Sequence, residues 1–190
     1  MIFAESARLI LRRPRPEDYE PLLASWSHPE ISRYTPDRAD LRGFIRQMIV
    51  DMQAKRPGDT HPGGPWYQFV AERREDGALV GDLGVGFWIP GDQQVELGYR
   101  IVPEAHRNGY GREATALLID YLVEHHDIHR FVGIAAAPNE ASKALLRSLG
   151  FRHEGHFIRS FNCHGEWLDD DYFALLASEW RSKKAAPGPV

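Results

Sequence analysis

The sequence predicts a single α/β domain (α+β in the stricter sense), in which one mixed, largely antiparallel central sheet is flanked by helices. The expected order is β-α-α-β-β-β-α-β-α-β-β. Two observations lead to this fold class. The spacing of hydrophobic residues changes from about 3.6 to about 2 at Trp66 and back again after Val102, as expected where helices border a strand meander. Turn-forming clusters at Glu75-Asp76-Gly77 and Pro90-Gly91-Asp92 separate the runs of alternating residues, as in hairpins.

The N-terminal third is expected to hold one strand and two helices. Arg8 to Arg12 alternates like a short strand. Pro16-Glu17-Asp18 then begins a helix that ends at His28-Pro29, because proline and acidic residues favour a first helical turn. A second amphipathic helix is expected from Asp37 to Lys55, followed by a turn-rich connection from Gly58 to Pro65.

The rest of the chain alternates strands and helices. Expected strands are Trp66 to Arg73, Leu79 to Ile89, Gln94 to Val102 and Arg130 to Ala137. One helix begins near Gly109 and another near Asn139, the second closed by Gly150 in a left-handed conformation. Phe151 to Phe161 and Glu166 to Ser178 form a final hairpin around His164-Gly165. The domain is thus expected to span residues 1–180, with a flexible tail at 181–190.

Composition excludes several classes of function. The chain is 43% hydrophobic and carries a formal net charge of −4, so it has a core but no overall positive charge to bind nucleic acid or an anionic membrane. The single cysteine, Cys163, forms no intrachain disulfide and suggests a reducing compartment. No apolar run approaches the roughly 18 residues of a membrane span. A cytoplasmic protein is therefore expected.

The segment after Val102 contains the clearest candidate site. A strand ends there, and a glycine-containing loop leads to a helix near Gly109 that no side chain caps. Free amides at a helix start bind phosphate well, and glycine lets the backbone approach closely. His106, Arg107 and Arg112 add donors, which favours a diphosphate ligand. The alternative is a glycine-rich turn that only packs the helix on the strand. A Walker motif and the third glycine of a dinucleotide fingerprint are both absent.

This region resembles a known family. Arg107-Asn108-Gly109-Tyr110-Gly111-Arg112 is similar to the acyl-coenzyme A pyrophosphate loop of the GNAT N-acetyltransferases. A second segment resembles the downstream helix of the same family and runs from Asn139 through Ser142 and Leu146 to Gly150-Phe151. A third segment, from Gly165 to Leu176, resembles the C-terminal hairpin of the RimJ/RimL-like branch. The opening from Arg8 to Asp18 also fits that branch. The resemblance covers nearly the whole chain with its motifs in order.

The resemblance implies a set of residues that bind acetyl-CoA, the co-substrate, and no metal. Backbone groups of Ile101 and Val102 would pair with the pantetheine arm, and Asn139 would hold the arm or the thiolate region. The expected binding residues are Ile101, Val102, His106, Arg107, Asn108, Gly109, Tyr110, Gly111, Arg112, Asn139, Ser142 and Lys143. Two positions depart from the family pattern. His106 replaces the usual Gln or Arg, and Leu146 replaces a tyrosine general acid, so Ser142 becomes the candidate donor to the leaving sulfur.

Glu96 is the expected general base. It alternates with Val95, Leu97 and Tyr99, and therefore shares the opposite strand face with Gly98. A solvent-facing carboxylate is the alternative, and Asp82 is the reserve candidate. Deprotonating an α-amine of pKa ~8 costs about 1.4 kcal/mol at pH 7, against about 4.6 kcal/mol for a lysine near 10.4. Such an acceptor therefore needs only a weak base acting through water.

The expected activity is transfer of an acetyl group from acetyl-CoA to a primary amine, chiefly the α-amine of a protein or peptide. The alternatives are a small amine such as an aminoglycoside, a succinyl donor, or a non-catalytic coenzyme-binding protein. A homodimer is compatible with the resemblance. Trp66, Tyr67, Trp88 and Trp167 are candidates for lining the acceptor pocket, although sheet aromatics usually lie in a core.

Overall fold

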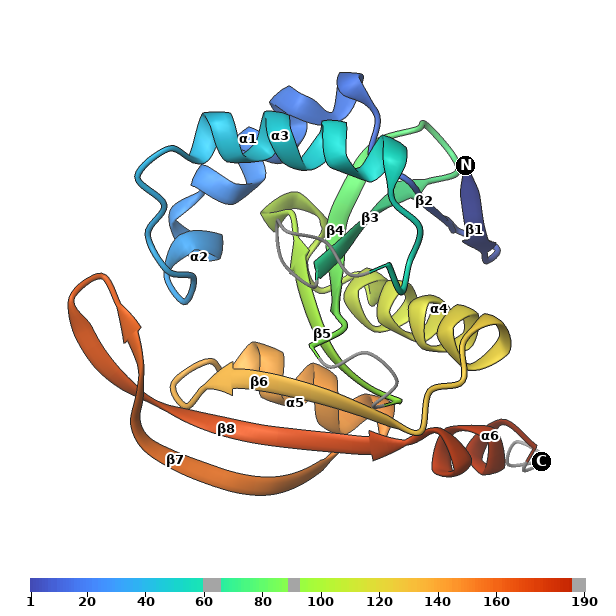
Figure 1. Cartoon of the computed structure of the whole chain (residues 1–190), viewed down its shortest axis with the longest axis vertical. Helices are drawn as coiled ribbons and strands as arrows, with labels where there is room; N and C mark the ends of the chain where they lie inside the picture. The colour runs from blue at the N-terminus through green and yellow to red at the C-terminus, as the bar shows by residue number, and fades with distance from the viewer. Residues whose placement is uncertain (60–65, 89–92, 186–190) are drawn as a thin grey trace.

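The strands form one sheet in the order β1-β2-β3-β4-β5-β6-β8-β7 (Figure 1). The computed structural model describes residues 1–59, 66–88 and 93–185. The strands are β1 (Ile2–Glu5), β2 (Leu9–Arg12), β3 (Trp66–Arg73), β4 (Leu79–Gly86), β5 (Gln94–Ile101), β6 (Arg130–Ala136), β7 (Arg152–Cys163) and β8 (Glu166–Leu176). The helices are α1 (Tyr19–Ser27), α2 (Pro29–Ser32), α3 (Leu41–Ala54), α4 (Tyr110–His125), α5 (Glu140–Leu149) and α6 (Ala177–Ala185), with short 3-10 turns at Pro16–Asp18 and Pro103–Ala105.

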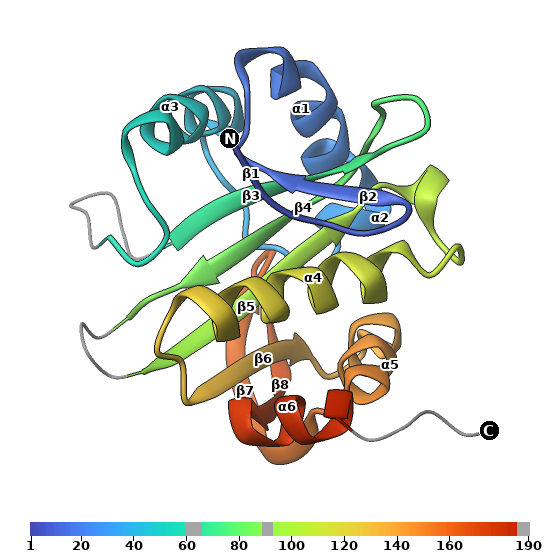
Figure 2. The ribbon, with the colours of Figure 1, turned by 90° about the vertical axis from the view of Figure 1, so that its right-hand side faces the viewer.

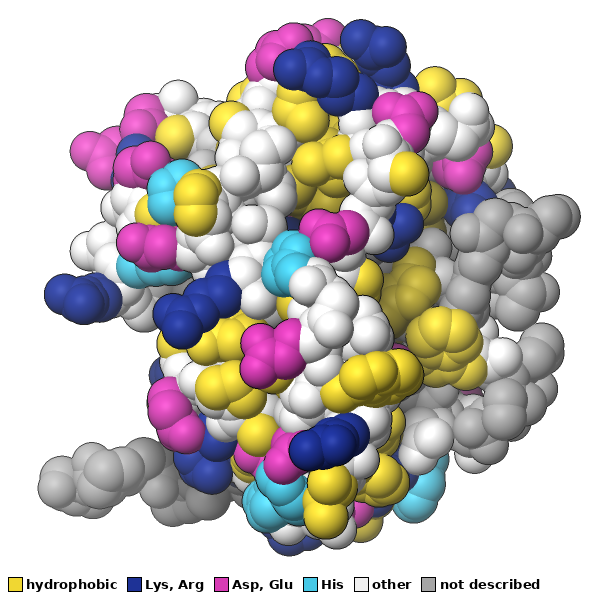
Figure 3. Space-filling view, turned by 90° about the vertical axis from the view of Figure 1, so that its left-hand side faces the viewer, with side chains coloured by type: hydrophobic (Ala, Val, Ile, Leu, Met, Phe, Trp, Pro, Cys, Tyr) yellow, Lys and Arg dark blue, Asp and Glu magenta, His cyan; other side chains and the backbone are white. Residues whose placement is uncertain are grey.

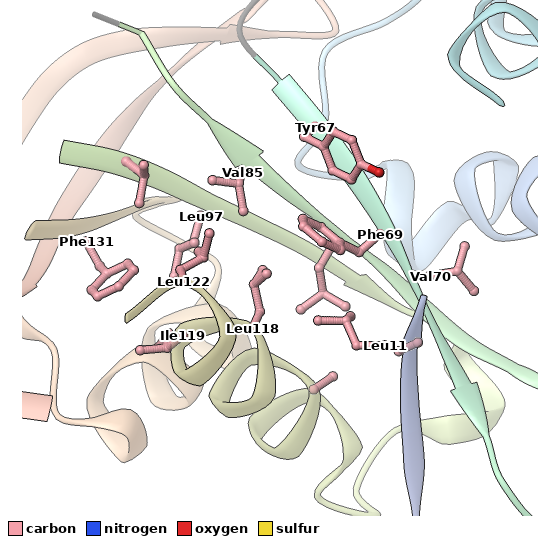
Figure 4. Close-up of a cluster of buried hydrophobic side chains, with 14 of the residues drawn as sticks. Leu11, Tyr67, Phe69, Val70, Val85, Leu97, Leu118, Ile119, Leu122 and Phe131 are labelled. Atoms are coloured by element: carbon pink, nitrogen blue, oxygen red, sulfur yellow. The ribbon is translucent and has the colours of Figure 1, made fainter. Parts of the chain in front are cut away.

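Helices cover both faces of the sheet, which explains why the central strands are hydrophobic along most of their length. Helix α4 packs on one face, and α1 and α3 pack on the other (Figures 1 and 2). Leu118, Ile119 and Leu122 of α4 are fully buried against side chains of β3 to β6 (Figure 4). Phe69 of β3 points to this layer, whereas its neighbour Val70 points to the opposite face. Alternation along the strands therefore decides which layer each side chain joins.

The sheet opens between β5 and β6. These strands pair in parallel only from Gln94 to Leu97 on β5 and from Arg130 to Gly133 on β6. Beyond this point β5 stays paired with β4, and β6 stays paired with β8 up to Ala136. The two halves of the sheet consequently diverge, and Figure 1 shows β5 and β6 separating towards α2 and the β7–β8 hairpin.

The predicted mixed, largely antiparallel sheet is confirmed, with three elements added. Strand β1, the single turn α2 and helix α6 were not expected from the sequence. Helix α6 means that the last predicted strand ends at Leu176 rather than Ser178, and that the tail is helical as far as Ala185 rather than frayed from Arg181. The physical reason is that Trp180 is buried and donates from Nε1 to Asp120 of α4 at 2.8 Å.

Other predicted elements agree with the structure at their centres and differ at their ends. The second helix begins at Leu41 rather than Asp37, because Asp40 caps it by accepting from Gly43 N at 2.8 Å. Gly150 has a φ of 101° and closes α5 as expected. The predicted turn at 90–92, the end of the strand at Ile89 and most of the connection before Trp66 lie outside the described residues. None of the described helices has the length and apolarity needed to cross a membrane.

Candidate active site

A cavity of about 1480 Å³ occupies the opening between the two halves of the sheet. Residues of β5 from Leu97 to Ile101 line one side, and residues of β6 from Gly133 to Ala136 line the other. The start of α4, the start of α5, and the segment from α2 to α3 complete the wall. Figure 3 looks at the side of the molecule that carries α2 and shows hydrophobic side chains gathered between charged ones. The cavity thus has two sheet faces open to it.

On the α4 face, the helix start is built from main chain. Its N-cap residue is Gly109, with a φ of 76°, and it has no side chain to accept from the first-turn amides. Arg107 is also left-handed, at a φ of 60°, so the chain turns sharply into the helix. Gly109, Tyr110, Gly111 and Arg112 all line the cavity. The first amides of α4 and the positive end of its dipole are therefore available to an anion there.

Gly111 has a packing reason as well. A Cβ at this position would lie 2.8 Å from Cδ1 of Leu145 and 3.2 Å from Cγ1 of Ile101, closer than side chains can approach. At Gly109 an added Cβ would meet only Nη2 of Arg8, at 3.7 Å. Helix packing is therefore the interpretation that applies to Gly111, and close approach of a phosphate is the one that applies to Gly109.

Side chains from the loop and from the N-terminal strands hold this turn in place. The ring of His106 forms a hydrogen bond between Nε2 and the carbonyl oxygen of Ile101 at 2.7 Å, which folds the loop back on β5. Arg8 donates to the carbonyl of Asn108 at 3.1 Å, pairs with Glu113 of α4, and stacks on the ring of Tyr110 at 4.6 Å. His106 and Arg8 therefore fix the shape of the turn.

Beyond Leu97, the backbone of β5 faces the cavity at alternate residues. Val102 donates its amide to the carbonyl of Val80 in β4 at 2.9 Å, and its own carbonyl accepts from Ala105 N at 2.9 Å. Because main-chain groups alternate along a strand, those of Tyr99 and Ile101 point the other way, into the opening. Val102 lies outside the cavity lining and does not fit the expected pairing with pantetheine, because its amide is already bonded. The main-chain groups of Tyr99 and the amide of Ile101 are better placed, whereas the Ile101 carbonyl already accepts from His106.

The start of α5 brings a pair of hydroxyl groups to the cavity. Asn139 caps the helix by accepting from Ser142 N at 3.1 Å, and both residues line the cavity. Ser142 Oγ lies 2.9 Å from the hydroxyl oxygen of Tyr99, which is also 3.2 Å from the Ser142 carbonyl oxygen, so the single phenol proton can bond to either atom of Ser142. Burial raises the pKa of Tyr99 to about 12, so the phenol keeps its proton. Tyr99 was expected only to share the Leu97 face, and its contact with Ser142 depends on how α5 packs.

Two other residues of α5, Leu146 and Lys143, make contacts that the sequence did not indicate. Leu146 is buried and lines the cavity, and its Cδ2 occupies the place where a Cβ of Gly133 would be, at 2.6 Å. Lys143 turns away from the cavity and is buried against β8. Its Nζ is 3.2 Å from Asp171 and 2.7 Å from Glu140. The ammonium group that was expected to bind coenzyme is therefore already paired with these two carboxylates.

On the α1–α3 face, the side chains form cross-strand rows. Glu96 of β5 stands opposite Gly86, Gly98 opposite Gly84, and Arg100 opposite Asp82. Trp66 fills the space above the glycines, since an added Cβ at Gly84 would lie 2.9 Å from its ring. We call the strip floored by Trp66, Gln68, Gly84 and Gly98, between Glu96 and Arg100, the acceptor trough. Its floor residues line the cavity.

Glu96 stands at one end of the acceptor trough, next to lining residues but not among them. Its Oε2 accepts from Nε1 of Trp88 at 2.8 Å. Burial raises the pKa of Glu96, and nearby Asp170 adds to the rise, whereas the bond from Trp88 opposes it. A half-buried carboxylate with a raised pKa is a better proton acceptor than an exposed one. Glu96 shares its strand face with Gly98, as the alternation predicted.

Asp82 has a different environment from the one its reserve role requires. It is 1% exposed, accepts from Nε1 of Trp26 at 3.0 Å, and pairs with Nη1 of Arg100 at 3.0 Å. Burial raises its pKa, while the Arg100 charge and these hydrogen bonds oppose the rise. The carboxylate is thus committed to Trp26 and Arg100 and does not line the cavity. This leaves Glu96 as the better candidate for a base.

Of the four aromatic residues expected to line the acceptor pocket, two lie at the cavity and two do not. Trp66 lines the cavity and Trp88 holds Glu96. Tyr67 is 2% exposed and belongs to the core layer near α4, and Trp167 is exposed on the β7–β8 hairpin outside the cavity lining. Within residues 1–59, 66–88 and 93–185, His, Cys, Asp and Glu side chains form no cluster suited to a metal ion.

Comparisons with known proteins agree on one family. Residues 8–152 match the family model described as an acetyltransferase (GNAT) domain. The uncharacterized N-acetyltransferase YoaA of Bacillus subtilis (strain 168) is 28% identical over 172 residues, which span 90% of this chain and 95% of that protein.

Two solved structures share the fold. The ribosomal-protein-S5-alanine acetyltransferase of Vibrio fischeri has a TM-score of 0.78 at 18% identity, covering 95% of this chain and 98% of that one. The spermidine N-acetyltransferase of Vibrio cholerae, in complex with CoA and spermine, has a TM-score of 0.78 at 19% identity, covering 93% and 99%. At these identities the likeness concerns the fold alone.

Proposed function

We propose a protein or peptide α-amine as the acceptor of this chain, which belongs to the GNAT acetyltransferase family and is accordingly an N-acetyltransferase that uses acetyl-CoA. The resemblance of its C-terminal hairpin and its N-terminal opening to the RimJ/RimL-like branch supports this acceptor. The structural likeness to a ribosomal-protein-S5-alanine acetyltransferase also supports it, because the name of that relative gives a protein as its substrate.

The observation that carries the proposal is the pairing of one weak base with a cavity that opens on both sheet faces. Glu96 is held by Trp88 at the edge of the cavity, and its raised pKa suits removal of a proton from an amine of modest pKa. An α-amine of pKa ~8 needs only about 1.4 kcal/mol of such help at pH 7. A lysine acceptor would require a stronger base.

The residues on the α4 face fit a coenzyme with a diphosphate and an amide-containing arm. Amides at the start of α4 would bind the diphosphate, and the backbone groups of Tyr99 and the amide of Ile101 would pair with the arm as an added strand does. When bound, acetyl-CoA supplies an acyl thioester, which an uncharged amine attacks directly. The other binding candidates, His106, Arg107, Asn108, Arg112 and Asn139, support this turn or line its approach.

Two proton movements then fall to this chain. Glu96 takes a proton from the amine, through a water molecule where direct reach is lacking, because a protonated amine has no lone pair to attack with. The departing sulfur carries negative charge, and Ser142 donates a hydrogen bond to it. In this role Tyr99 is the donor in its 2.9 Å bond to Ser142 Oγ, which orients that hydroxyl and leaves the Ser142 proton for the sulfur. This pair takes the part that a tyrosine at position 146 would have.

A small amine is the second candidate acceptor, since a spermidine acetyltransferase shares the fold. The cavity lining disfavours polycationic examples such as polyamines and aminoglycosides, because Lys and Arg outnumber Asp and Glu among its residues. A succinyl donor and a binding protein without turnover remain alternatives that the same assay tests.

The experiment is a free-thiol release assay with acetyl-CoA and matched acceptors. The panel holds peptides with a free or a blocked N-terminus, peptides whose only amine is a lysine side chain, and spermidine. We expect thiol release with free α-amines and mass-spectrometric evidence of acetylation at the N-terminus. Faster turnover of lysine or spermidine would refute the α-amine proposal. Binding of acetyl-CoA without turnover of any amine would support the non-catalytic alternative.

A further inference from the structure

The end of the acceptor trough opposite Glu96 carries two guanidinium groups. Arg100 stacks over the ring of Trp26 at 3.6 Å, and Arg38 stacks over the ring of Phe44 at 3.7 Å. The two rings lie against each other, with centroids 5.4 Å apart. All four residues line the cavity. Stacking on adjacent rings fixes both guanidinium groups at the same end of the trough.

Only one of these two cations, Arg100, is paired with a carboxylate. Asp82 binds Arg100 through Nη1 and is otherwise bonded to Trp26. No described residue forms an ion pair with Arg38, whose only described contact is the Phe44 ring. Burial lowers the pKa of Arg38, and the Arg100 charge lowers it further. One positive charge at this end is therefore left without a counterion among the described residues. A guanidinium has five N–H donors, so most donors of both groups remain for a ligand.

The middle of the trough holds a polar atom that also lacks a partner. Gln68 is 9% exposed, lines the cavity, and its Oε1 forms no hydrogen bond with any described residue. A buried amide oxygen without a donor costs stability, which is recovered when a ligand N–H reaches it. The trough therefore offers a carboxylate at one end, an acceptor in the middle and cations at the other end. This arrangement matches a molecule with an amine, an amide and an anion in that order.

We propose that Arg38 and Arg100 form an anion subsite, so that the acceptor carries a carboxylate that binds there while its amine lies towards Glu96. The proposal rests on the acetyl-transfer function and narrows its substrate class. Glu96 and Arg100 are four residues apart on one strand, so their Cα atoms are about 13 Å apart. This span favours a carboxylate several bonds from the amine, as in the acidic side chain of an N-terminal peptide segment.

The test compares acceptors that differ only in this charge. One arm uses peptides with Glu or Gln at the second position, with amidated C-termini. A second arm uses free amino acids and their carboxamides, which place the carboxylate next to the amine. For the wild type we expect kcat/KM to be about 10-fold or more higher for the Glu peptide than for the Gln peptide, the size of a charged hydrogen bond. A larger preference in the second arm would assign the subsite to a free amino acid.

Arg38→Gln should abolish this preference, so that the ratio of kcat/KM for the Glu peptide to that for the Gln peptide falls to about 1. Arg46→Gln is the matched control, because Arg46 also stacks on a ring, that of Tyr19 at 4.9 Å, but does not line the cavity. The preference should survive in that variant. Equal use of both peptides by the wild type, or an undiminished preference in Arg38→Gln, would overturn the subsite.

A binding measurement separates this proposal from the proposed function. Succinate is titrated in a thermal shift assay with saturating CoA, which fills the anion site at α4. Stabilisation of the wild type and Arg46→Gln but not of Arg38→Gln supports the subsite even if no amine is turned over. Thiol release from neutral peptides without any effect of succinate would retain the acetyltransferase function and refute the subsite.

Discussion

The two faces of the cavity are built from different materials. On the α4 face, the ligand-facing groups are main-chain amides and carbonyls, at Gly109 to Arg112 and at Tyr99 and Ile101. On the α1–α3 face they are the side chains of Gln68, Arg38 and Arg100, set on a floor of Trp66 and glycines, with Glu96 next to them outside the lining. A main-chain site needs only the right turn at the right place, whereas a side-chain site depends on each residue present.

This difference explains what each face can determine. The coenzyme is common to the family, and free amides at a helix start reached through a left-handed glycine are a general way of binding phosphate. The acceptor varies between relatives, and the α1–α3 face can change by substitution without disturbing the sheet. Variants on the two faces should therefore separate coenzyme affinity from acceptor turnover.

Glu96→Gln should have the largest effect. We expect kcat to fall about 100-fold, because a general base contributes at least that much, while the Kd for acetyl-CoA stays unchanged. The loss should grow with the pKa of the amine. Because the pKa of Glu96 is raised by burial, wild-type kcat/KM should fall as pH falls through a value above the ordinary 4.5, and this acid limb should vanish in the variant. A uniform loss across amines would remove Glu96 from this role.

Gly109→Val comes next and acts on the other face. A β-branched residue at a φ of 76° is strained by about 1–3 kcal/mol, and its Cβ would lie 3.7 Å from Nη2 of Arg8, which holds this turn. We expect the Kd for acetyl-CoA to rise about 10-fold or more by isothermal titration. Gly77→Val is the matched control, since Gly77 has a φ of 73°, open space around it and no part in the cavity. Equal losses of affinity in both variants would indicate strain alone.

Tyr99→Phe tests the hydroxyl that contacts Ser142 of α5. This hydroxyl orients Ser142, so we expect kcat to fall about 5- to 10-fold, as for loss of one hydrogen bond of about 1 kcal/mol. The KM for the acceptor should not change. Tyr67→Phe removes a buried hydroxyl outside the cavity and should leave kcat unaltered. If Tyr99→Phe retained full kcat with every acyl acceptor, Ser142 would act without it.

Substitution of His164 should have the smallest effect, because this residue contacts the segment from α2 to α3 from outside the cavity. It lies in the β7–β8 turn and binds the Ser32 carbonyl at 3.1 Å and Asp37 at 2.7 Å. These bonds raise its pKa above 6.5, so the contact is complete below that pH and is lost as pH rises through the raised value. The acceptor KM of His164→Gln, divided by that of the wild type, should be about 2 at pH 6 and about 1 at pH 8.5. A ratio independent of pH would contradict this role.

The sequence predicted the α4 face better than the α1–α3 face for a physical reason. The strand–loop–helix with Gly109 is local, so its geometry follows from neighbouring residues. Even there, packing against Leu145 and the bonded amide of Val102 were not evident, since both depend on distant elements.

On the α1–α3 face, the alternation that predicted Glu96 and Gly98 also extends to Arg100, a signal that was present and not used. Arg38 could not be predicted, because it lies between α2 and α3, and only the folding of that segment over the sheet brings it to the cavity. Helix α6 was missed because its polar sequence is anchored by only two buried residues, Ala177 and Trp180.

The most direct test of this two-faced site is a crystal structure with CoA bound. We expect phosphate oxygens within about 3.2 Å of main-chain nitrogens among residues 109–112, the range of a hydrogen bond, with the α1–α3 face left open to the acceptor. A diphosphate bound instead to Arg38 and Arg100 would contradict the assignment of both faces.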